Sequence, residues 1–503
     1  MLDSFAKLGL GSLSRRRVLA LGFFGAASAA LAACSSAAPA QPTAAGGAAP
    51  AATQAPAATS AAAPTTAPAP ATAATAASPT AAAAAAPTVA PTVAAQPASG
   101  TSAELTFFYP VGVAGPLSKL IDGLTGQFNQ QQNGAIKVTP VYSGDYLQSL
   151  SKAQTALQGG KPPDVVVLNA TAIYTLQDMN AVIGLNDLIK ASGDNVADDF
   201  FPAFMANSKL GDTIYGIPFQ RSTLVYYYNT DLLTQNGLDA KGPQTWDDVI
   251  SFGTKLTQRQ GNTVSRWGVG FPSSGSSYWE FQALAIEAGQ NVMGDVGNKV
   301  FFNTDAAIKA LQWQIDLAKS HQIMNSGTID WGNLPTDFAG AKTAMIYHST
   351  GSLSFIAKQS KFNVGVAFCP KDKQFGSPTG GGNLYIFKDI SPANQAAAWK
   401  FVQFMTTPAT LAQWSIDTGY VAPRKASYDV PAYKDYTTKF PQALVARDQL
   451  QYAQNELGTH QMAQVQTILS NGIQAALTGK QSPKDALTAA QGQAEQLLAN
   501  FKT

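Results

Sequence analysis

The chain has little charge and few of the residues that build metal sites or disulfides. Only 13% of its 503 residues are charged, against about 25% in an ordinary globular domain. Its 33 basic and 31 acidic side chains leave a net charge of +2, which provides no basic field for a nucleic acid. Two cysteines exclude a disulfide framework, and the three histidines lack metal-ligand spacing. We therefore expect no metal, no other cofactor and no nucleic-acid partner.

Motifs of covalent or phosphate chemistry are also missing. The sequence has no Gly-x-Ser-x-Gly nucleophile elbow, and neither Gly160-Lys161 nor Gly479-Lys480 precedes the Ser or Thr of a phosphate loop. His348 stands shortly before Ser352, and we favour a structural histidine at a strand end over a nucleophile pair. Paired carboxylates of a glycoside hydrolase leave no sequence signature. A secreted, lipid-anchored carbohydrate-active hydrolase therefore stays the alternative to a protein without catalysis.

The N-terminus has the layout of an export signal. Residues 14–19, Ser-Arg-Arg-Arg-Val-Leu, open an apolar run that ends at residue 33 and is too short to cross a hydrocarbon core of about 30 Å comfortably. Residues 31–34, Leu-Ala-Ala-Cys, resemble a bacterial lipobox. We predict that 1–33 is a removed signal peptide and that Cys34 becomes the lipidated N-terminus. The arginines fit either a twin-arginine signal or an ordinary secretory signal.

A low-complexity segment follows the signal. Residues 35–100 consist of Ala, Pro, Thr, Ser, Gly, Gln and Val, without a charged or aromatic side chain. Such a segment buries too little apolar surface to offset its ordering entropy, and its recurrent prolines interrupt any alanine helix. We expect residues 34–100, the lipidated cysteine included, to be a disordered tether that holds a folded domain away from a membrane surface.

Residues 101–503 have the pattern of an α/β domain. Strands are predicted by the short apolar runs at 105–109, 136–142, 165–168 and 224–229. The first three are separated by segments of helical spacing, and a β-α-β-α-β series favours a parallel sheet. Thr245, followed closely by two acidic residues, predicts the start of a helix. Apolar residues at three-and-four spacing predict that the C-terminal third is mostly helical.

Glycine and proline divide this domain at 217–219, Gly340 and 380–382. We interpret these places as crossings between two lobes, because hinges concentrate in a few segments at element ends. Three unrelated surface loops are the alternative. The division assigns lobe 1 to about 101–218 plus 342–382, and lobe 2 to about 222–340 plus 384–503.

Aromatic residues stand near the expected lobe edges. They are Tyr109, Tyr142, Tyr146, Tyr278, Trp279, Tyr385 and Tyr420. Sugars and polyols present flat C–H faces and hydroxyl rims, which aromatic rings and hydrogen-bonding groups bind. Each of these residues also fits a core position, so the prediction of a sugar site depends on their coincidence with turns and glycines.

Several motifs occur in order along residues 104–500. They include Thr-Trp-Asp-Asp at 245–248, Gly-Gly-Asn-Leu at 381–384, the helical segment 392–406 and Gly-Tyr-Val-Ala-Pro-Arg at 419–424. Together they resemble the extracellular solute-binding proteins of carbohydrate ABC importers, and Tyr-Ser-Gly-Asp-Tyr at 142–146 is similar to a turn of the glycerol-3-phosphate-binding branch. The resemblance implies an α/β, two-lobe class II periplasmic-binding fold with hinge crossings, which closes around a ligand.

The resemblance also indicates ligand contacts. Positions that touch the ligand in that branch correspond here to Tyr146, Ser222, Tyr278, Ser352, Gly382 and Tyr420, and Tyr109, Trp279 and Arg221 complete the predicted set. At two positions this chain differs from that branch, which limits how far the ligand contacts of the branch apply here. Ala170 replaces a ligand-binding acid, and Gln466, which cannot act as a guanidinium, replaces a phosphate-binding arginine. Arg221 either brings a positive charge into the cleft from the opposite lobe, or lies in solvent or in an ion pair.

From this resemblance we expect a non-enzymatic binding protein of an ABC importer. It would capture a carbohydrate or polyol outside the cytoplasm and deliver it to the membrane subunits of a permease. We expect a monomer that is attached to the cell membrane through Cys34. A ligand such as glycerol-3-phosphate stays open, although the sparse charge of residues 101–503 favours a neutral ligand.

The predicted lipid anchor is tested by Cys34→Ala. Removal of the acylated sulfur removes the anchor, so we expect the variant in the soluble fraction after cell breakage and ultracentrifugation, whereas the wild-type chain sediments with membranes. Cys369→Ala leaves the lipobox intact and is the control. Continued sedimentation of Cys34→Ala with membranes would contradict the prediction.

Overall fold

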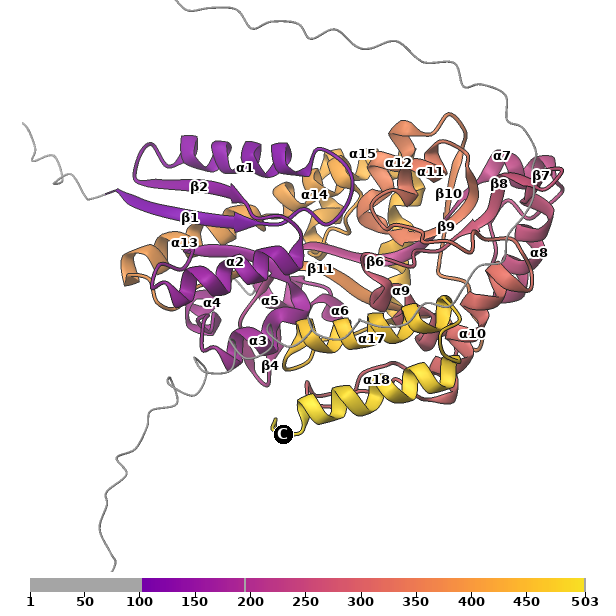
Figure 1. Cartoon of the computed structure of the whole chain (residues 1–503). Helices are drawn as coiled ribbons and strands as arrows, with labels where there is room; N and C mark the ends of the chain where they lie inside the picture. The colour runs from indigo at the N-terminus through magenta and orange to yellow at the C-terminus, as the bar shows by residue number, and fades with distance from the viewer. Residues whose placement is uncertain (1–101, 194–195, 502–503) are drawn as a thin grey trace, which may run out of the picture. The chain divides into compact units, whose positions relative to one another are not determined.

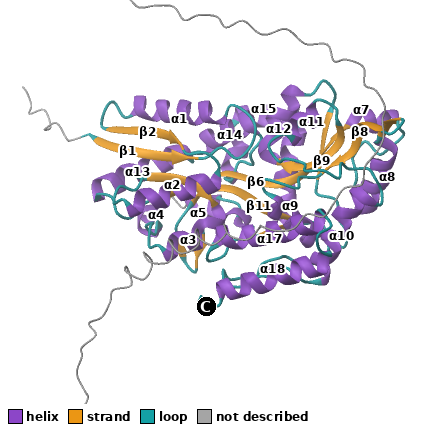
Figure 2. Ribbon diagram, viewed as in Figure 1, coloured by secondary structure: helices purple, strands orange, loops and turns teal. Residues whose placement is uncertain are grey.

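The computed structural model describes residues 102–193 and 196–501, which belong to one compact unit (Figure 1). The predicted signal peptide at 1–33, the lipidated Cys34 and the tether at 34–100 lie outside the described residues. Within the described unit, strands run through the middle and helices cover them on both sides (Figure 2).

The β-α-β-α-β series predicted at the start of the domain is confirmed. It consists of β1 (Ala103–Tyr109), α1 (Leu117–Gln131), β2 (Ile136–Tyr142), α2 (Tyr146–Gln158) and β3 (Val165–Asn169). Both β2 and β3 pair with β1 in parallel. Asp145 starts α2 with a capping box: its carboxylate accepts from the Gln148 N–H, and the Gln148 side chain accepts from the Asp145 N–H.

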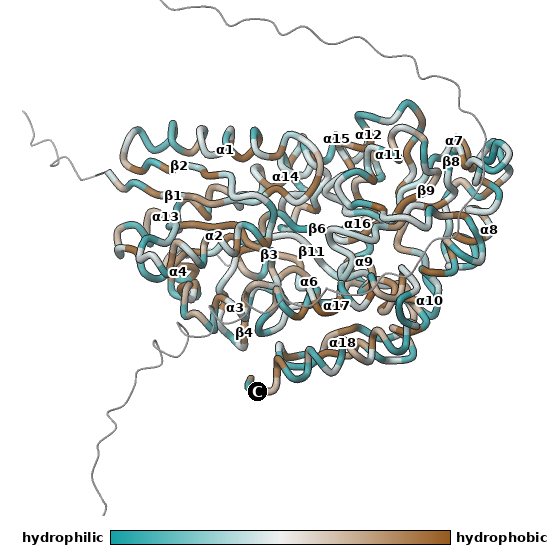
Figure 3. The backbone as a smooth tube through the Cα atoms, viewed as in Figure 1, coloured by the Kyte–Doolittle hydropathy of each residue, from teal (hydrophilic) through white to brown (hydrophobic). Residues whose placement is uncertain are grey.

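Strand β3 is apolar on both faces because helices cover both. Val165 and Val167 pack into the core that α1 shares with α13 (Pro392–Met405). Val166 and Leu168 pack on the opposite face against α2. A continuous apolar run is the pattern of a parallel strand buried on two sides. Helix α1, by contrast, alternates hydrophilic and hydrophobic residues in Figure 3, as packing on one side requires.

Two long strands join the halves of the sheet. The central strands are β6 (Ile217–Asn229) and β11 (Ser377–Ile386), and the sheet continues through β9 (Thr343–Ser349), β8 (Thr263–Gly270) and β7 (Gln258–Gln260). β6 and β11 pair antiparallel with each other, β11 also pairs with β3, and β6 also pairs with β9. The order is β2-β1-β3-β11-β6-β9-β8-β7. Lobe 1, which carries β1–β3, and lobe 2, which carries β7–β9, therefore share one sheet.

Lobe 2 is built around a large apolar core. Its helices include α8 (Trp246–Leu256), α9 (Ser277–Glu287), α10 (Asp305–Lys319), α17 (Met462–Leu477) and α18 (Pro483–Leu498). Thr245 caps α8 as predicted: its hydroxyl accepts from the Asp248 N–H, and the Asp248 carboxylate accepts from the Thr245 N–H. The next residue, Trp246, stacks on Trp313 with ring centroids 4.5 Å apart, which holds α8 against α10.

Shorter elements complete the described chain. They are α3 (Ile173–Asp178), α4 (Asn186–Ala191), α5 (Val196–Asp199), α6 (Pro202–Met205), β4 (Lys209–Leu210), β5 (Thr213–Ile214), α7 (Thr230–Gln235), α11 (Leu334–Ala339), α12 (Leu353–Gln359), β10 (Val364–Ala367), α14 (Pro408–Thr418), α15 (Pro431–Lys439), α16 (Val445–Gln449) and β12 (Ala453–Gln454). Helices dominate after β11, so the predicted helical character of the C-terminal third is confirmed.

Two segments belong to the other lobe from the one predicted. Strand β9, within the segment 342–382 expected in lobe 1, pairs with β6 and β8 and packs in the lobe 2 core. Helix α13, within 384–503 expected in lobe 2, packs Phe401 at 5.0 Å from Phe107 and 5.1 Å from Phe128 in the lobe 1 core. The assignment is corrected because β11 runs from lobe 2 into lobe 1, opposite to the assumed direction.

Two of the three predicted crossings lie in the central strands. Residues 217–219 begin β6, and 380–382 form the middle of β11. Gly340 instead ends α11, which packs in one core with the following β9, so the prediction of a crossing there is wrong. The third connection between the lobes is made by residues 419–461, because α14 packs in lobe 1 and α17 packs in lobe 2.

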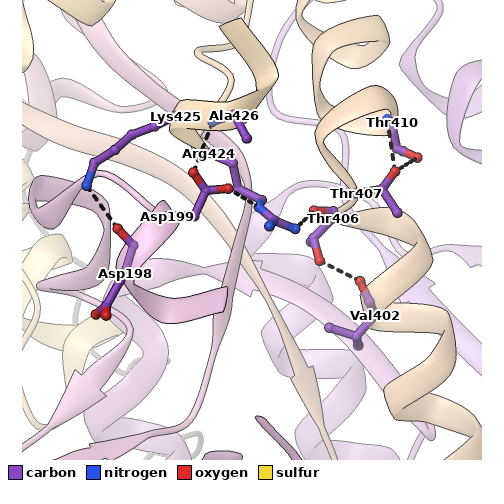
Figure 4. A network of polar contacts seen from close by, with 9 residues as sticks. All are labelled: Asp198, Asp199, Val402, Thr406, Thr407, Thr410, Arg424, Lys425 and Ala426. Carbon is purple, nitrogen blue, oxygen red and sulfur yellow. Dashed lines mark hydrogen bonds and ion pairs between the residues drawn. The ribbon is translucent and has the colours of Figure 1, made fainter. Parts of the chain in front are cut away.

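Arg424 fixes the start of this third connection to lobe 1. Its Nε donates to Asp199 Oδ2 at 2.6 Å, and its Nη1 donates to the Thr406 carbonyl at 3.1 Å (Figure 4). The Ala426 N–H donates to the other oxygen of Asp199 at 3.0 Å. Charge-assisted hydrogen bonds of this kind are about twice as strong as neutral ones. The chain is therefore held firmly just before it passes into lobe 2.

Gly381 is a position where β11 and β6 approach closely. It has a φ of +88°, and a Cβ there would overlap the carbonyl oxygen of Gln220. Gly134 has a similar φ of +84° at an exposed site, where a Cβ would meet nothing within 4 Å. The two glycines share the backbone conformation and differ in the close approach.

This difference predicts unequal effects of alanine. Gly134→Ala adds left-handed strain alone and is expected to lower the free energy of unfolding by about 1 kcal/mol. Gly381→Ala adds steric overlap and is expected to lower it by about 3 kcal/mol or more. Urea unfolding followed by tryptophan fluorescence measures both variants. Equal losses would show that the β6–β11 approach does not constrain residue 381.

Candidate functional site

A cavity of about 210 Å³ lies between the two lobes. It is lined by Gly112, Val113, Asp145, Tyr146, Leu147, Leu150, Asn169, Ala172, Ser222, Gly275, Ser276, Tyr278, Trp279, Trp331, Ser349, Gly381, Tyr420, Glu456, Met462 and Gln466. These lining residues come from both lobes, from the two central strands and from the third connection. A change in the angle between the lobes therefore changes the cavity.

Strand ends and helix starts of lobe 1 supply one wall. Residues 112–113 follow β1, the first residues of α2 follow β2, and Asn169 ends β3. The carboxyl ends of parallel strands meet at one edge of a sheet, where α/β proteins bind their ligands. Asn169 is held by its own turn, since its Oδ1 accepts from the Thr171 N–H at 2.9 Å and from the Thr171 hydroxyl at 2.8 Å. Its amide nitrogen is thereby free to donate to Glu456 Oε1, at 3.2 Å.

Lobe 2 supplies an aromatic wall. Tyr278 and Trp279 lie in the first turn of α9, and the Trp279 indole N–H donates to the Thr379 carbonyl at 3.0 Å. The Trp331 indole N–H donates to the Gly112 carbonyl of lobe 1, also at 3.0 Å. This last hydrogen bond joins the lobes beside the cavity, so the structure describes a closed arrangement.

His348 supports Trp331 from behind. The two rings stack with centroids 3.7 Å apart at 18°, and His348 Nε2 lies 3.0 Å from the Trp331 carbonyl oxygen. Because a carbonyl only accepts, Nε2 carries the proton and Nδ1 accepts from the Ser352 hydroxyl at 3.0 Å. Burial lowers the pKa of His348 to about 4, so the ring is neutral at neutral pH. Ser352 is fully buried and is not a lining residue, which agrees with the structural role predicted for this histidine.

Glu456 is a buried acid in the cavity wall. Its Oε1 accepts from the Tyr278 hydroxyl at 2.8 Å and from the Asn169 amide. The side chain is 2% exposed, and burial raises its pKa to about 7, against the opposing effects of the Tyr278 hydrogen bond, the Arg221 charge and the Asn169 hydrogen bond. Through this carboxylate the third connection links a residue of lobe 2 to a residue of lobe 1.

Arg221 is fully buried at the junction of the central strands. Its Nη1 donates to Asn383 Oδ1 at 2.8 Å, and its guanidinium carbon lies 4.9 Å from the centre of the Phe204 ring. Burial lowers its pKa to about 10, although the charge of Glu456 acts in the opposite direction. Arg221 is not a lining residue, and it lies neither in solvent nor in a salt bridge with any described acid. From the sequence we expect Arg221 either in the cleft, or in solvent or an ion pair, and its position differs from both alternatives.

The cavity brings together five of the nine predicted contacts. These are Tyr146, Ser222, Tyr278, Trp279 and Tyr420, whereas Tyr109, Arg221, Ser352 and Gly382 are not lining residues. Tyr109 lies in the lobe 1 core, where its hydroxyl donates to Asp122 at 2.8 Å. Gly382 pairs within the sheet, and its neighbour Gly381 lines the cavity in its place.

Trp331 and Glu456 are among the lining residues that the sequence analysis missed. Trp331 follows no recognisable motif, and Glu456 lies in a stretch without regular spacing. The resemblance placed an acid just after β3, where this chain has Ala170. The structure brings a carboxylate to that strand end from the C-terminal part of the chain. Gln466, noted for its lack of charge, does line the cavity and donates to the Leu457 carbonyl at 3.0 Å.

A closed cavity between two lobes that share one sheet is the arrangement of a solute-binding protein. A sequence model of the bacterial extracellular solute-binding proteins matches residues 124–441. The chain belongs to this family, and the family predicted from the sequence is confirmed. An Escherichia coli O1:K1 / APEC relative, the sn-glycerol-3-phosphate-binding periplasmic protein UgpB, is 28% identical over 406 residues, which cover 77% of this chain and 91% of the relative.

Solved structures confirm the fold. UgpB from Mycobacterium tuberculosis, in complex with glycerophosphocholine, has a TM-score of 0.71 and 25% identity, and the match covers 80% of this chain and 99% of that chain. An ABC transporter solute-binding protein from Thermotoga lettingae, bound with alpha-D-tagatose, has a TM-score of 0.69 and 21% identity, over 79% of this chain and 100% of the other. The predicted α/β periplasmic-binding fold is therefore correct.

The described residues contain neither a membrane-spanning helix nor a cluster of metal-binding side chains. Over 102–193 and 196–501, no helix has the length and apolar character needed to span a membrane. The same residues contain no group of three or more His, Cys, Asp or Glu side chains arranged to hold a metal ion.

The raised pKa of Glu456 predicts a pH-dependent stability. Between its ordinary value of 4.5 and about 7, the folded state keeps the proton that the unfolded state has lost, so this group makes the protein less stable as pH rises. Glu456→Gln removes the effect. We expect the variant to gain roughly 3 kcal/mol of unfolding free energy relative to wild type between pH 4.5 and pH 7.5.

Urea unfolding of the unliganded protein at both pH values measures this difference. Glu104→Gln, which removes an exposed carboxylate on β1, is the matched control and is expected to show little change. A variant-minus-wild-type difference that is the same at both pH values would contradict the raised pKa.

Proposed function

We propose that the protein is the substrate-binding component of an ABC importer, which captures a carbohydrate or polyol and delivers it to a permease. The observation that carries the proposal is the cavity between the lobes, where aromatic rings and amide, hydroxyl and carboxylate groups converge. Rings bind the C–H faces of a sugar, and the polar groups bind its hydroxyls. A ligand that contacts both lobes stabilises the closed arrangement over an open one.

The dimensions and charge of the cavity favour a small uncharged or cationic molecule over a phosphate ester. A volume of about 210 Å³ is below the common range of about 300–1,000 Å³ for ligand pockets, which favours a monosaccharide or a short polyol. Glu456 and Asp145 line the cavity, and Gln466 stands where the related branch has an arginine. A phosphate would meet two carboxylates and no guanidinium.

We propose export through residues 1–33, lipid attachment at Cys34, and a monomer that presents its ligand to the membrane subunits of the permease outside the cytoplasm. The periplasmic relatives of the family support an extracytoplasmic location. The three arginines of the signal fit both the twin-arginine route and the general secretion route.

We propose that the protein has no catalytic activity. The Escherichia coli relative and the Thermotoga lettingae protein are binding proteins, which supports an importer component and gives no support to the hydrolase alternative. Ser352 and His348 are buried behind Trp331, where a substrate would not reach a nucleophile.

The function is tested by titrating the purified protein calorimetrically with neutral monosaccharides and polyols, while turnover of each compound is assayed. We expect saturable binding of at least one compound and no turnover. Trp331→Ala removes a ring of the cavity and the indole bond to Gly112, and should weaken binding of that compound about tenfold or more.

Tyr452→Ala removes an exposed ring that is not part of the cavity and should bind as wild type does. Turnover that disappears in Trp331→Ala would support the hydrolase instead. Unchanged affinity in Trp331→Ala would mean that the ligand binds elsewhere.

A further inference from the structure

One oxygen of the acid in the cavity wall has no partner. Oε1 of Glu456 accepts two hydrogen bonds, from Tyr278 and Asn169. Oε2 is buried and has no hydrogen-bond partner among the residues that the structure describes. An unpaired carboxylate oxygen is costly to bury. Its position in the cavity wall indicates that a bound molecule supplies the missing partner.

The cavity itself offers this oxygen no cation. Among the described lining residues none is Lys, Arg or His, and Asp145 adds a second carboxylate on the exposed side. Arg221 attenuates the charge of Glu456 from a distance, but its guanidinium hydrogen-bonds to Asn383. Glu280, fully buried on α9, is not a lining residue, and burial together with the charge of Glu456 raises its pKa well above the ordinary value. The charge that the lining residues present to a ligand is therefore negative.

Aromatic rings complete the surroundings. Tyr146, Tyr278, Trp279, Trp331 and Tyr420 all line the cavity. A ring face attracts a cation within about 6 Å of its centre, and the attraction grows when water is excluded. Ring faces combined with an unpaired carboxylate are suited to an ammonium group, whereas ring faces with neutral amides alone would suit an uncharged sugar.

We propose that the ligand carries a protonated amino group on a hydroxylated body, and that this group binds Oε2 of Glu456. An amino sugar or an amino polyol has this chemistry. The proposal rests on the proposed function and narrows its ligand class, because the hydroxylated body still occupies the rings and amides of the cavity. Glu456 is then the residue that selects the charged compound over its neutral counterpart.

Matched pairs of compounds test the proposal. The purified protein is titrated at pH 8 with glucamine and sorbitol, and with glucosamine, galactosamine and mannosamine beside glucose, galactose and mannose. Glucamine has an aliphatic amine that stays protonated at neutral pH, like that of lysine. We expect at least one amine to bind ten times or more tightly than its neutral partner.

Glu456→Gln identifies the group responsible. The substitution nearly keeps the shape of the side chain but removes its charge and replaces one acceptor oxygen by a donor, so the ratio of amine affinity to neutral-partner affinity should fall to within about threefold of unity. Glu104→Gln, which removes an exposed acid outside the cavity, should retain the full preference.

A pH series on the wild-type protein gives a second measurement that needs no variant. Glu456 has a pKa of about 7, so lowering the pH from 8 to 6 protonates it while glucamine stays charged. The affinity for a bound amine such as glucamine should fall over this interval, and the affinity for the neutral partner should change little.

The possible outcomes separate the two proposals. Neutral compounds that bind as tightly as their amines, or an amine preference that survives in Glu456→Gln, would overturn the amine proposal and leave the proposed function standing. Failure of every neutral and amine compound to bind would overturn both.

Discussion

The pairing of β6 with β11 is the constraint on which the rest of the structure depends. These two strands run through both lobes, so every residue of the cavity is positioned relative to them. Their close approach requires Gly381, and the register shifts next to it, between Gly382 and Asn383. Asn383 then accepts from Arg221 and donates to the Asn207 carbonyl at 3.1 Å. A buried cation and a buried amide are thus hydrogen-bonded to each other at the junction from which both lobes extend.

The binding site is formed by segments of both lobes that meet beside this junction. Lobe 1 presents the carboxyl ends of its parallel strands, lobe 2 presents the first turn of α9, and the third connection brings Glu456 between them. Contacts across the cavity, such as the Trp331 indole with the Gly112 carbonyl, exist only when the lobes are close. Ligand binding and lobe closure are therefore coupled, since residues of both lobes line the cavity.

Much of the fold was predictable because it is locally encoded. The apolar run at β3 indicates a buried strand, and Thr245 indicates the capping hydrogen bonds of a helix start. In both cases the signal lies within a few neighbouring residues. The lobe assignment of β9 and α13 was wrong because it depends on the direction in which β11 crosses the molecule. Local spacing contains no information about that direction. The same holds for Tyr109, whose ring is equally suited to a core and to a binding surface.

The amino-acid sequence by itself determined the class of the protein: an α/β domain of low charge, with ordered motifs of the solute-binding family and aromatic residues near its turns. The tertiary structure decided which of those aromatic residues share a cavity and which acid joins them. Glu456 comes to Asn169 from 287 positions further along the chain. Such contacts are set by the packing of whole elements, so a residue's own neighbours in sequence do not reveal them.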